Sequence, residues 1–108
     1  MSIQLLEHLR DRLIEYGAVA NTPEFCTAWL GRSPGYIRVL RYHKISPSVE
    51  ALAICASKLG YYADRLRSSE QKEHQQWCDR FDELQALCEV EIERLTQAKW
   101  RSPKRMAL

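Results

Sequence analysis

The sequence has few of the residues that break helices, with only four glycines and four prolines among its 108 residues. No run of alternating β-branched residues predicts a strand, and no internal repeat is present. No stretch approaches the roughly 20 apolar residues that a membrane-spanning helix needs, and the opening segment lacks the basic and apolar regions of a signal peptide. We therefore expect one all-α domain of ordinary size that stays in the cytoplasm, without a membrane partner.

Residue patterns typical of catalytic sites are also missing. The sequence contains no phosphate-binding glycine loop and no nucleophile elbow, and its three histidines lie far apart. The four cysteines lack CxxC spacing, and Cys26, Cys55 and Cys88 fall on apolar stripes, as small core residues do. His74 and Cys78 have the i, i+4 spacing of half a metal site, but no second pair accompanies them. We therefore expect a protein that is not an enzyme and that holds no cofactor and no metal.

What the sequence does contain is a run of short helical segments over residues 22–60. Gly31 can take the left-handed C-cap of the first helix, and Ser33 can cap the next, with Pro34 in its first turn. A connection of about three residues holds two helices at a steep angle, so the second can project into a DNA major groove about 12 Å wide. This geometry predicts a DNA-binding module whose recognition helix is Pro34 to His43.

The predicted recognition helix has one apolar face and one basic face. Ile37 and Leu40 mark the inner face by their i, i+3 spacing. Residues 32–44 contain four lysines or arginines and no acidic residue, although the net charge of the whole chain is only +2. The outward positions are Gly35, Arg38, Arg41 and Tyr42. A basic helix face is often solvated charge alone, but here it coincides with helix-turn-helix spacing.

Charge and geometry suggest a role for the outward residues. Phosphate contacts release condensed counterions without reading sequence, and three cations are candidates for them: Arg32, Arg41 and Lys44. Arg38 is the candidate for base recognition, since a guanidinium can pair with O6 and N7 of guanine. Tyr42, one turn later, can pack on a thymine methyl or bind a phosphate, whereas Tyr36 is better suited to the edge of the domain.

A second start signal at Ser46-Pro47 leads into another apolar stripe, which closes at Gly60. With this repeat of the stop-and-start pattern, the sequence resembles the lambda-repressor-like (XRE-type) helix-turn-helix family. The residues that carry the resemblance are Leu30, Gly31, Ser33, Tyr36, Ile37, Leu40 and the segment from Pro47 to Gly60. The resemblance covers roughly residues 2–62. It implies a compact helical bundle that binds double-stranded DNA as a bacterial or phage transcriptional regulator.

The resemblance also implies which positions face DNA. Carried over one by one, they are Ser33, Pro34, Gly35, Arg38 and Tyr42, with the Thr22 end of the preceding helix against phosphate. The full predicted DNA-binding set is Thr22, Arg32, Ser33, Pro34, Gly35, Tyr36, Arg38, Arg41, Tyr42 and Lys44. Phe25 and Trp29 depart from the family pattern, because they are large aromatics at positions that are commonly solvent-exposed. We therefore expect another part of the chain, or a partner, to cover them.

Segments on both sides complete the predicted architecture. Apolar residues near the start of the chain form a core-facing helix that Gly17 stops. This helix completes a predicted DNA-binding bundle over residues 1–67. At the other end, residues 100–108 are predicted to be a basic, flexible tail, because Pro103 ends any helix.

The last predicted helix is long and carries a seam of apolar residues. Ser68 and Ser69 can cap it, and it extends from about Glu70 to Lys99 within a unit of residues 68–99. Its apolar positions repeat at intervals of 4, 3, 4 and 7, as in a coiled coil: Trp77, Phe81, Leu84, Cys88 and Leu95. This seam predicts homodimerisation.

Two alternatives for the long helix stay open. It can fold back as a further helix of the bundle and cover Phe25 and Trp29. Its acidic face can instead lie over the recognition helix or bind another regulatory protein, which would make the chain an anti-activator or adaptor. The sequence thus predicts a sequence-specific DNA-binding transcriptional regulator, cytoplasmic and nucleoid-associated when bound. The alternative is a protein-interaction module derived from a helix-turn-helix.

Overall fold

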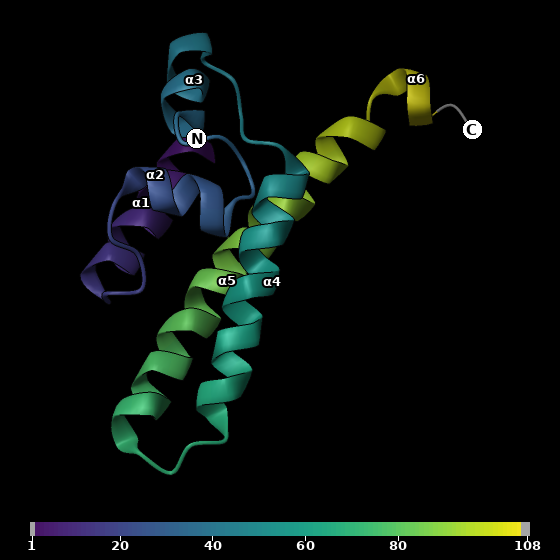
Figure 1. The fold of residues 1–108 in the computed structure, drawn as a ribbon. Coiled ribbons are helices and arrows are strands. Elements are labelled where there is room, and N and C mark those ends of the chain that lie inside the picture. Colours follow the sequence, from purple (N-terminus) through teal and green to yellow (C-terminus); the bar gives the residue numbers. More distant parts are fainter. Residues whose placement is uncertain (1, 107–108) are drawn as a thin grey trace.

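The computed structural model describes residues 2–106, whose regular elements are all helices. In chain order they are α1 (Ser2–Glu15), α2 (Thr22–Glu24), the π-helix η1 (Phe25–Trp29), α3 (Tyr36–His43), α4 (Val49–Arg67), α5 (Lys72–Trp100) and α6 (Pro103–Met106). Figure 1 shows α4 and α5 side by side as a long antiparallel pair, with α1, α2 and α3 on one side of it. The described residues therefore confirm the predicted all-α architecture with a long C-terminal helix.

The N-terminal helices pack because each has an apolar face and a defined end. Leu6, Leu9 and Leu13 of α1 are fully buried. Gly17 follows this helix in the left-handed region, at φ +79°, as a residue without a side chain can do freely. The Asn21 side chain caps α2 by accepting a hydrogen bond from the backbone N–H three residues later, at 2.9 Å. These ends fix how α1 and α2 enter the core.

The fourth helix does not end at Gly60, where the sequence predicted a stop. It begins after an N-cap at Ser48, whose side chain accepts a hydrogen bond from the first turn, and continues to Arg67. A Cβ atom at Gly60 would lie 2.4 Å from Nε2 of Gln85 on α5, and this amide donates to the Ala56 carbonyl oxygen at 3.1 Å. Gly60 is therefore a point of close approach between two helices, and its missing side chain leaves room for Gln85.

The apolar seam of α5 packs within its own chain. Phe81, Leu84 and Cys88 are buried in the same core as Cys55 and Leu59 of α4. The long helix thus folds back within the single chain, and it packs along α4.

The remaining two residues of the predicted dimer seam are also engaged within the chain. Trp77 packs edge to face on Tyr16, just after α1, with ring centroids 4.8 Å apart. Leu95 is partly buried against the same core. The side chains predicted to form a dimer seam therefore pack inside one molecule. A heptad-like spacing indicates that a helix face is buried, but it does not indicate whether the same chain or a second copy buries it.

The two aromatics that needed a cover are buried by other parts of the chain. Phe25 is fully buried in the core, and Trp29 is only 3% exposed. The Trp29 indole packs on Tyr62 of α4 at a centroid distance of 5.8 Å, and Nζ of Lys58 lies 4.5 Å from its centroid. Tyr62 lies beyond Gly60, so the continuation of α4 past that glycine is what covers Trp29.

The ends of the last helices differ from the prediction. α5 begins at Lys72 after an N-cap without a side-chain hydrogen bond. Ser69 does not cap it, and a hydrogen bond of 2.6 Å joins Ser69 Oγ to Nδ1 of His74. Residues 103–106, predicted to be part of a flexible tail, form the short helix α6. The predicted tail residues 107–108 lie outside the described part of the chain.

Both long helices are amphipathic and bury one face in a single core. The buried residues from Leu6 to Cys88 form one cluster, which crosses the division predicted after residue 67. The N-terminal helices and α5 therefore share one core. Within residues 2–106, no helix is long and apolar enough to cross a membrane.

Replacing Leu84 with alanine should destabilise the single chain, because this side chain is 3% exposed and lies in the core. We expect the free energy of unfolding to fall by about 2 to 5 kcal/mol, the range for a truncated core leucine. The matched control is Leu87→Ala, since Leu87 lies on the same helix and is 42% exposed; its cost should stay below about 1 kcal/mol. Urea denaturation followed by circular dichroism gives both values. Equal losses, or unchanged stability of Leu84→Ala with a changed oligomeric state in light scattering, would contradict the fold-back packing.

Candidate nucleic-acid interface

Two buried side chains and a short turn hold α3 in place. Ile37 and Leu40 are buried, which confirms the predicted inner face. Gly31 adopts the left-handed conformation, with φ +65°, also as predicted. After it, the Arg32 backbone N–H donates to the Cys26 carbonyl oxygen at 2.9 Å, which closes the preceding helix. These contacts fix the direction in which α3 leaves the N-terminal helices.

The helix predicted to recognise DNA starts later than the sequence indicated. α3 begins at Tyr36, after Gly35 in the N-cap position, and no side chain caps it. Ser33 contributes its carbonyl oxygen, which accepts a hydrogen bond from the Tyr36 backbone N–H at 3.1 Å. Ser33 and Pro34 thus lie in the turn, where both are exposed. The first turn of α3 remains open to a ligand that approaches from solvent.

The outward face of α3 presents cations and an aromatic ring to solvent. Tyr42 is 82% exposed. Arg38 is exposed and makes no ion pair in the described part of the chain. A Cβ atom at Gly35 would lie 2.9 Å from Nη2 of Arg38, so the guanidinium lies across the start of the helix in space that glycine leaves. Lys44 closes α3 in a left-handed conformation, at φ +54°, and its exposed side chain also makes no ion pair among residues 2–106.

Arg32 and Tyr36 form a bracket between the turn and the start of α4. Nη2 of Arg32 donates to Oγ of Ser48 at 2.8 Å and to Oε2 of Glu50 at 3.3 Å. The guanidinium lies over the Tyr36 ring, 5.8 Å from its centroid, and the Tyr36 hydroxyl accepts a hydrogen bond from the Ser48 backbone N–H at 3.0 Å. Both residues were predicted to contact DNA, and in the structure both make contacts with the start of α4.

The remaining predicted residues divide between the open face and its margins. The Arg41 guanidinium forms an ion pair with Glu7 of α1, yet its side chain is exposed. An exposed pair of this kind contributes only about 0 to 1 kcal/mol, so a phosphate can compete for the arginine. Thr22 begins α2 as a half-buried residue. The structure therefore brings Arg38, Arg41 and Lys44 together on one short helix and its cap.

The described residues include one cluster of possible metal ligands, on α5. Cys78, Asp79 and Asp82 place one ligand atom each within 4.8 Å of one another. The Asp82 carboxylate already pairs with Arg67 through both oxygens, at 3.1 and 3.2 Å. Burial raises the pKa of the Cys78 thiol, which keeps it protonated. A cationic neighbour and a protonated thiol both disfavour a metal ion.

The cysteines offer no accessible nucleophile. All four are buried free thiols. A hydrogen bond with Cys88, together with burial, raises the pKa of the Cys55 thiol far above its usual range. A thiol that stays protonated and lies out of reach of solvent is chemically inert. This environment agrees with the expectation that these residues serve packing.

The partners of Arg32 and Arg41 could not be predicted from the sequence. No local pattern indicates that Ser48 and Glu50, at the start of α4, meet Arg32, or that Glu7 of α1 meets Arg41. The π-helix η1 also carried no recognisable signal. One clue was available for Tyr36, since its position beside Ile37 already favoured the domain edge over the open face.

Taken together, these features define a class: an all-α protein in which a short helix, anchored by two buried aliphatic side chains, exposes a basic and aromatic face. The chain belongs to the family of unknown function DUF6626, which matches residues 6–101. No curated protein and no solved structure matches the chain.

Replacing Arg32 with alanine should lower the free energy of unfolding by on the order of 1 kcal/mol, because Ser48 and Glu50 lose a charged hydrogen-bond donor. Arg32→Lys should recover only part of the loss, since one ammonium cannot reproduce the planar fork. Arg38→Ala serves as the control and should change stability by less than about 0.5 kcal/mol, as an exposed arginine without an ion pair. Chemical denaturation of the three variants measures the change in the free energy of unfolding. Equal losses of stability in Arg32→Ala and Arg38→Ala would show that the contacts of Arg32 with Ser48 and Glu50 do not stabilise the fold.

Proposed function

We propose that the protein is a transcriptional regulator that binds double-stranded DNA sequence-specifically, with α3 in the major groove. The observation that carries this proposal is the outward face of α3. Arg38 and Lys44 are exposed there without ion pairs among the described residues, and Tyr42 is almost fully exposed beside them. A lambda-repressor-like arrangement of α1 to α4 is part of the proposal and is supported by the left-handed Gly31 turn before α3.

Each residue of this face has a role that follows from its chemistry. Arg38 lies in the first turn of α3, the part of a recognition helix that contacts base edges, and its guanidinium can pair with guanine O6 and N7. Arg41 and Lys44 lie near the end of the helix and would neutralise phosphates, with Arg41 leaving Glu7. Tyr42 would meet a thymine methyl or a phosphate. Gly35, with no side chain, allows the guanidinium of Arg38 to move along the start of the helix.

A homodimer belongs to the same proposal but needs another surface. Two copies that bind a palindrome place their recognition helices about 34 to 36 Å apart. The apolar seam of α5 is used inside each chain, so it is not free to join two copies. Leu87, Val90 and Trp100 of α5 are exposed apolar side chains that remain open for such a contact.

A second candidate function is binding of another regulatory protein through the same helix. The observation in its favour is apolar exposure around α3, because Val39 is 45% and Ile45 is 53% exposed. Two of the basic residues in this region are also paired with Glu7 and Glu50, which lowers the positive charge available for phosphate. An exposed aromatic with aliphatic neighbours suits a protein interface.

Selection from random duplex DNA at roughly physiological salt should enrich a defined sequence if the first candidate holds. Arg38→Ala should then relax the preference at one base pair and weaken binding of the enriched site by about 1 to 3 kcal/mol. Lys44→Ala should weaken all sequences alike and reduce the slope of log K against log salt by about 1. Fluorescence anisotropy across a salt series measures both effects.

Lys72→Ala is the matched control, since Lys72 is an exposed cation at the start of α5, beside the loop that Figure 1 places at the far end from α3. It should leave DNA affinity unchanged. A folded protein that enriches no sequence, or whose affinity responds equally to Lys72→Ala and Lys44→Ala, would contradict DNA binding through α3 and favour the protein-binding candidate.

A further inference from the structure

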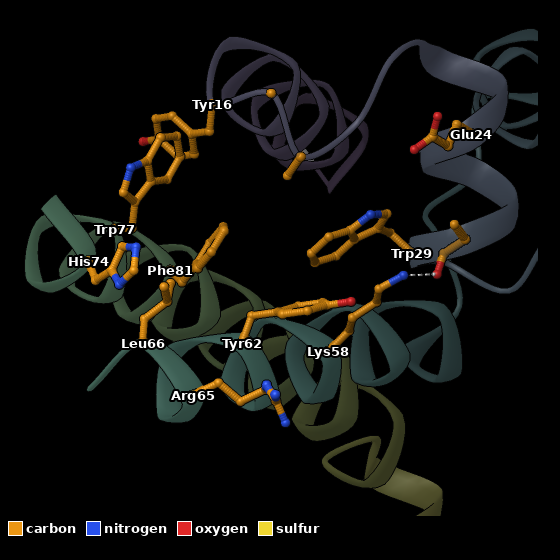
Figure 2. Close-up of a pocket in the computed structure, with 13 residues that line it drawn as sticks. Tyr16, Glu24, Trp29, Lys58, Tyr62, Arg65, Leu66, His74, Trp77 and Phe81 are labelled. Atoms are coloured by element: carbon orange, nitrogen blue, oxygen red, sulfur yellow. Dashed lines mark hydrogen bonds between the residues drawn. The ribbon is translucent and has the colours of Figure 1, made fainter. Parts of the chain in front are cut away.

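A pocket of about 770 Å³ opens between the N-terminal helices and the α4–α5 pair. Its lining comes from four separate segments: the turn after α1, the region of α2 and η1, the middle of α4 and the first turns of α5. Figure 2 shows Trp29 and Phe81 entering the space from opposite sides, with Tyr62 across the floor between them. Its volume lies within the range of about 300 to 1,000 Å³ that is typical of small-molecule sites.

The pocket is lined by aromatic rings that brace one another. Tyr16 lies edge to face on Trp77, at a centroid distance of 4.8 Å, and Phe81 lies 6.3 Å from Tyr16. On the other side, Trp29 and Tyr62 are 5.8 Å apart. Rings held in this way form a preformed apolar lining, and a flat ring that enters can stack on them or meet them edge to face. The walls therefore suit a planar aromatic ligand.

The floor of the pocket is basic on both sides of its central ring. Lys58, Tyr62 and Arg65 follow one another on α4 at i, i+4 and i+7, which places them along one face of the helix. A ring that lies on Tyr62 thus has one cation in the turn before it and another in the turn after it. Figure 2 shows Lys58 beside Trp29, whereas Arg65 extends away from the space and contributes at its mouth.

Neither cation is neutralised by a carboxylate in the described part of the chain. Nζ of Lys58 donates to the Ala28 carbonyl oxygen at 2.9 Å and otherwise faces the Trp29 indole. Arg65 donates to the Tyr61 hydroxyl at 3.1 Å. An amino group held by one carbonyl and one ring keeps hydrogen-bond donors for an anionic group.

One acid opposes these two cations. The Glu24 carboxylate points into the space from the opposite wall in Figure 2 and accepts one long hydrogen bond, of 3.4 Å, from the Ala20 backbone N–H. It lies across the pocket from the α4 face that carries Lys58 and Arg65. The charge of the lining is therefore positive on the side where the ring would rest. Because the Glu24 carboxylate would repel a bound anion, its removal should strengthen anion binding.

We infer that this pocket is a binding site for a planar aromatic carboxylate, with its ring on Tyr62 between Trp29 and Phe81 and its carboxylate at Lys58. The site stands apart from α3 and does not depend on the proposed DNA binding. It gives the protein a small-molecule ligand of defined chemistry.

Isothermal titration of the full chain with three probes of equal ring size tests the site: 2-naphthoate, the neutral 2-naphthamide and the cationic 2-(aminomethyl)naphthalene. We expect the carboxylate to bind about threefold to tenfold more tightly than the amide, and the amine to bind most weakly. Lys58→Met should remove the preference for the carboxylate and leave the affinity for the amide unchanged. Glu24→Gln should tighten binding of the carboxylate.

Two tyrosines, Tyr62 in the pocket and Tyr42 on α3, supply a matched pair of variants for the ring contact. Tyr62→Ala should weaken the carboxylate and the amide alike, by about fivefold or more, because both lose the floor of the pocket. Tyr42→Ala removes an equally large, exposed ring on α3 that does not line this pocket and should leave both affinities unchanged. Circular dichroism confirms that each variant is folded.

Several results would overturn the assignment. Absence of binding for all three probes at millimolar concentration would exclude an aromatic site. Tightest binding of the amine, weakened further by Glu24→Gln, would make the ligand a cation. A preference for the carboxylate that survives both Lys58→Met and Arg65→Met, or equal losses in Tyr42→Ala and Tyr62→Ala, would place any bound probe elsewhere. Since no DNA enters the titration, its result is independent of the outcome of the DNA selection.

Discussion

The packing of α5 along α4 is the interaction on which the rest of the molecule depends. Cys55 and Leu59 of α4 and Phe81 and Leu84 of α5 share one core, and each fully buried large apolar side chain contributes about 1.5 to 3 kcal/mol relative to exposure. This contact keeps the second half of α4 helical and in place. That half covers Trp29, and Trp29 ends the π-helix from which the turn to α3 departs. The position of the candidate interface thus follows from a contact between two other helices.

Helix ends could be predicted from the sequence wherever neighbouring residues decide them. Gly17 and Gly31 both take the left-handed conformation after a helix, and Ile37 faces the core as its spacing indicates. Gly60 is the same residue type, but it lies inside a helix because the deciding contact there comes from Gln85 on α5. No local pattern indicates that contact. The sequence therefore suggested a helix end at Gly60, where the structure has two helices in close approach.

The candidate sites show the same limit for side chains. Arg32 and Arg38 lie in one basic segment and look equivalent in the sequence, yet Arg32 is committed to Ser48 while Arg38 stays open. Which arginine is committed depends on where α4 begins in space. The aromatic pocket could not be predicted for a similar reason, because its rings come from segments that lie far apart in the chain and meet only after α5 has folded back.

Continuity of α4 through Gly60 makes this helix a rigid lever. Its beginning is joined through Ser48 to Arg32 and Tyr36, the bracket beside α3. Farther along the helix, Tyr62 forms the floor of the pocket. About 21 Å of unbroken helix separates the two points. A tilt of about 5° around the Tyr62 end therefore displaces the bracket by about 2 Å, with no refolding in between. A shift of α4 against Trp29 therefore also moves the turn from which α3 projects.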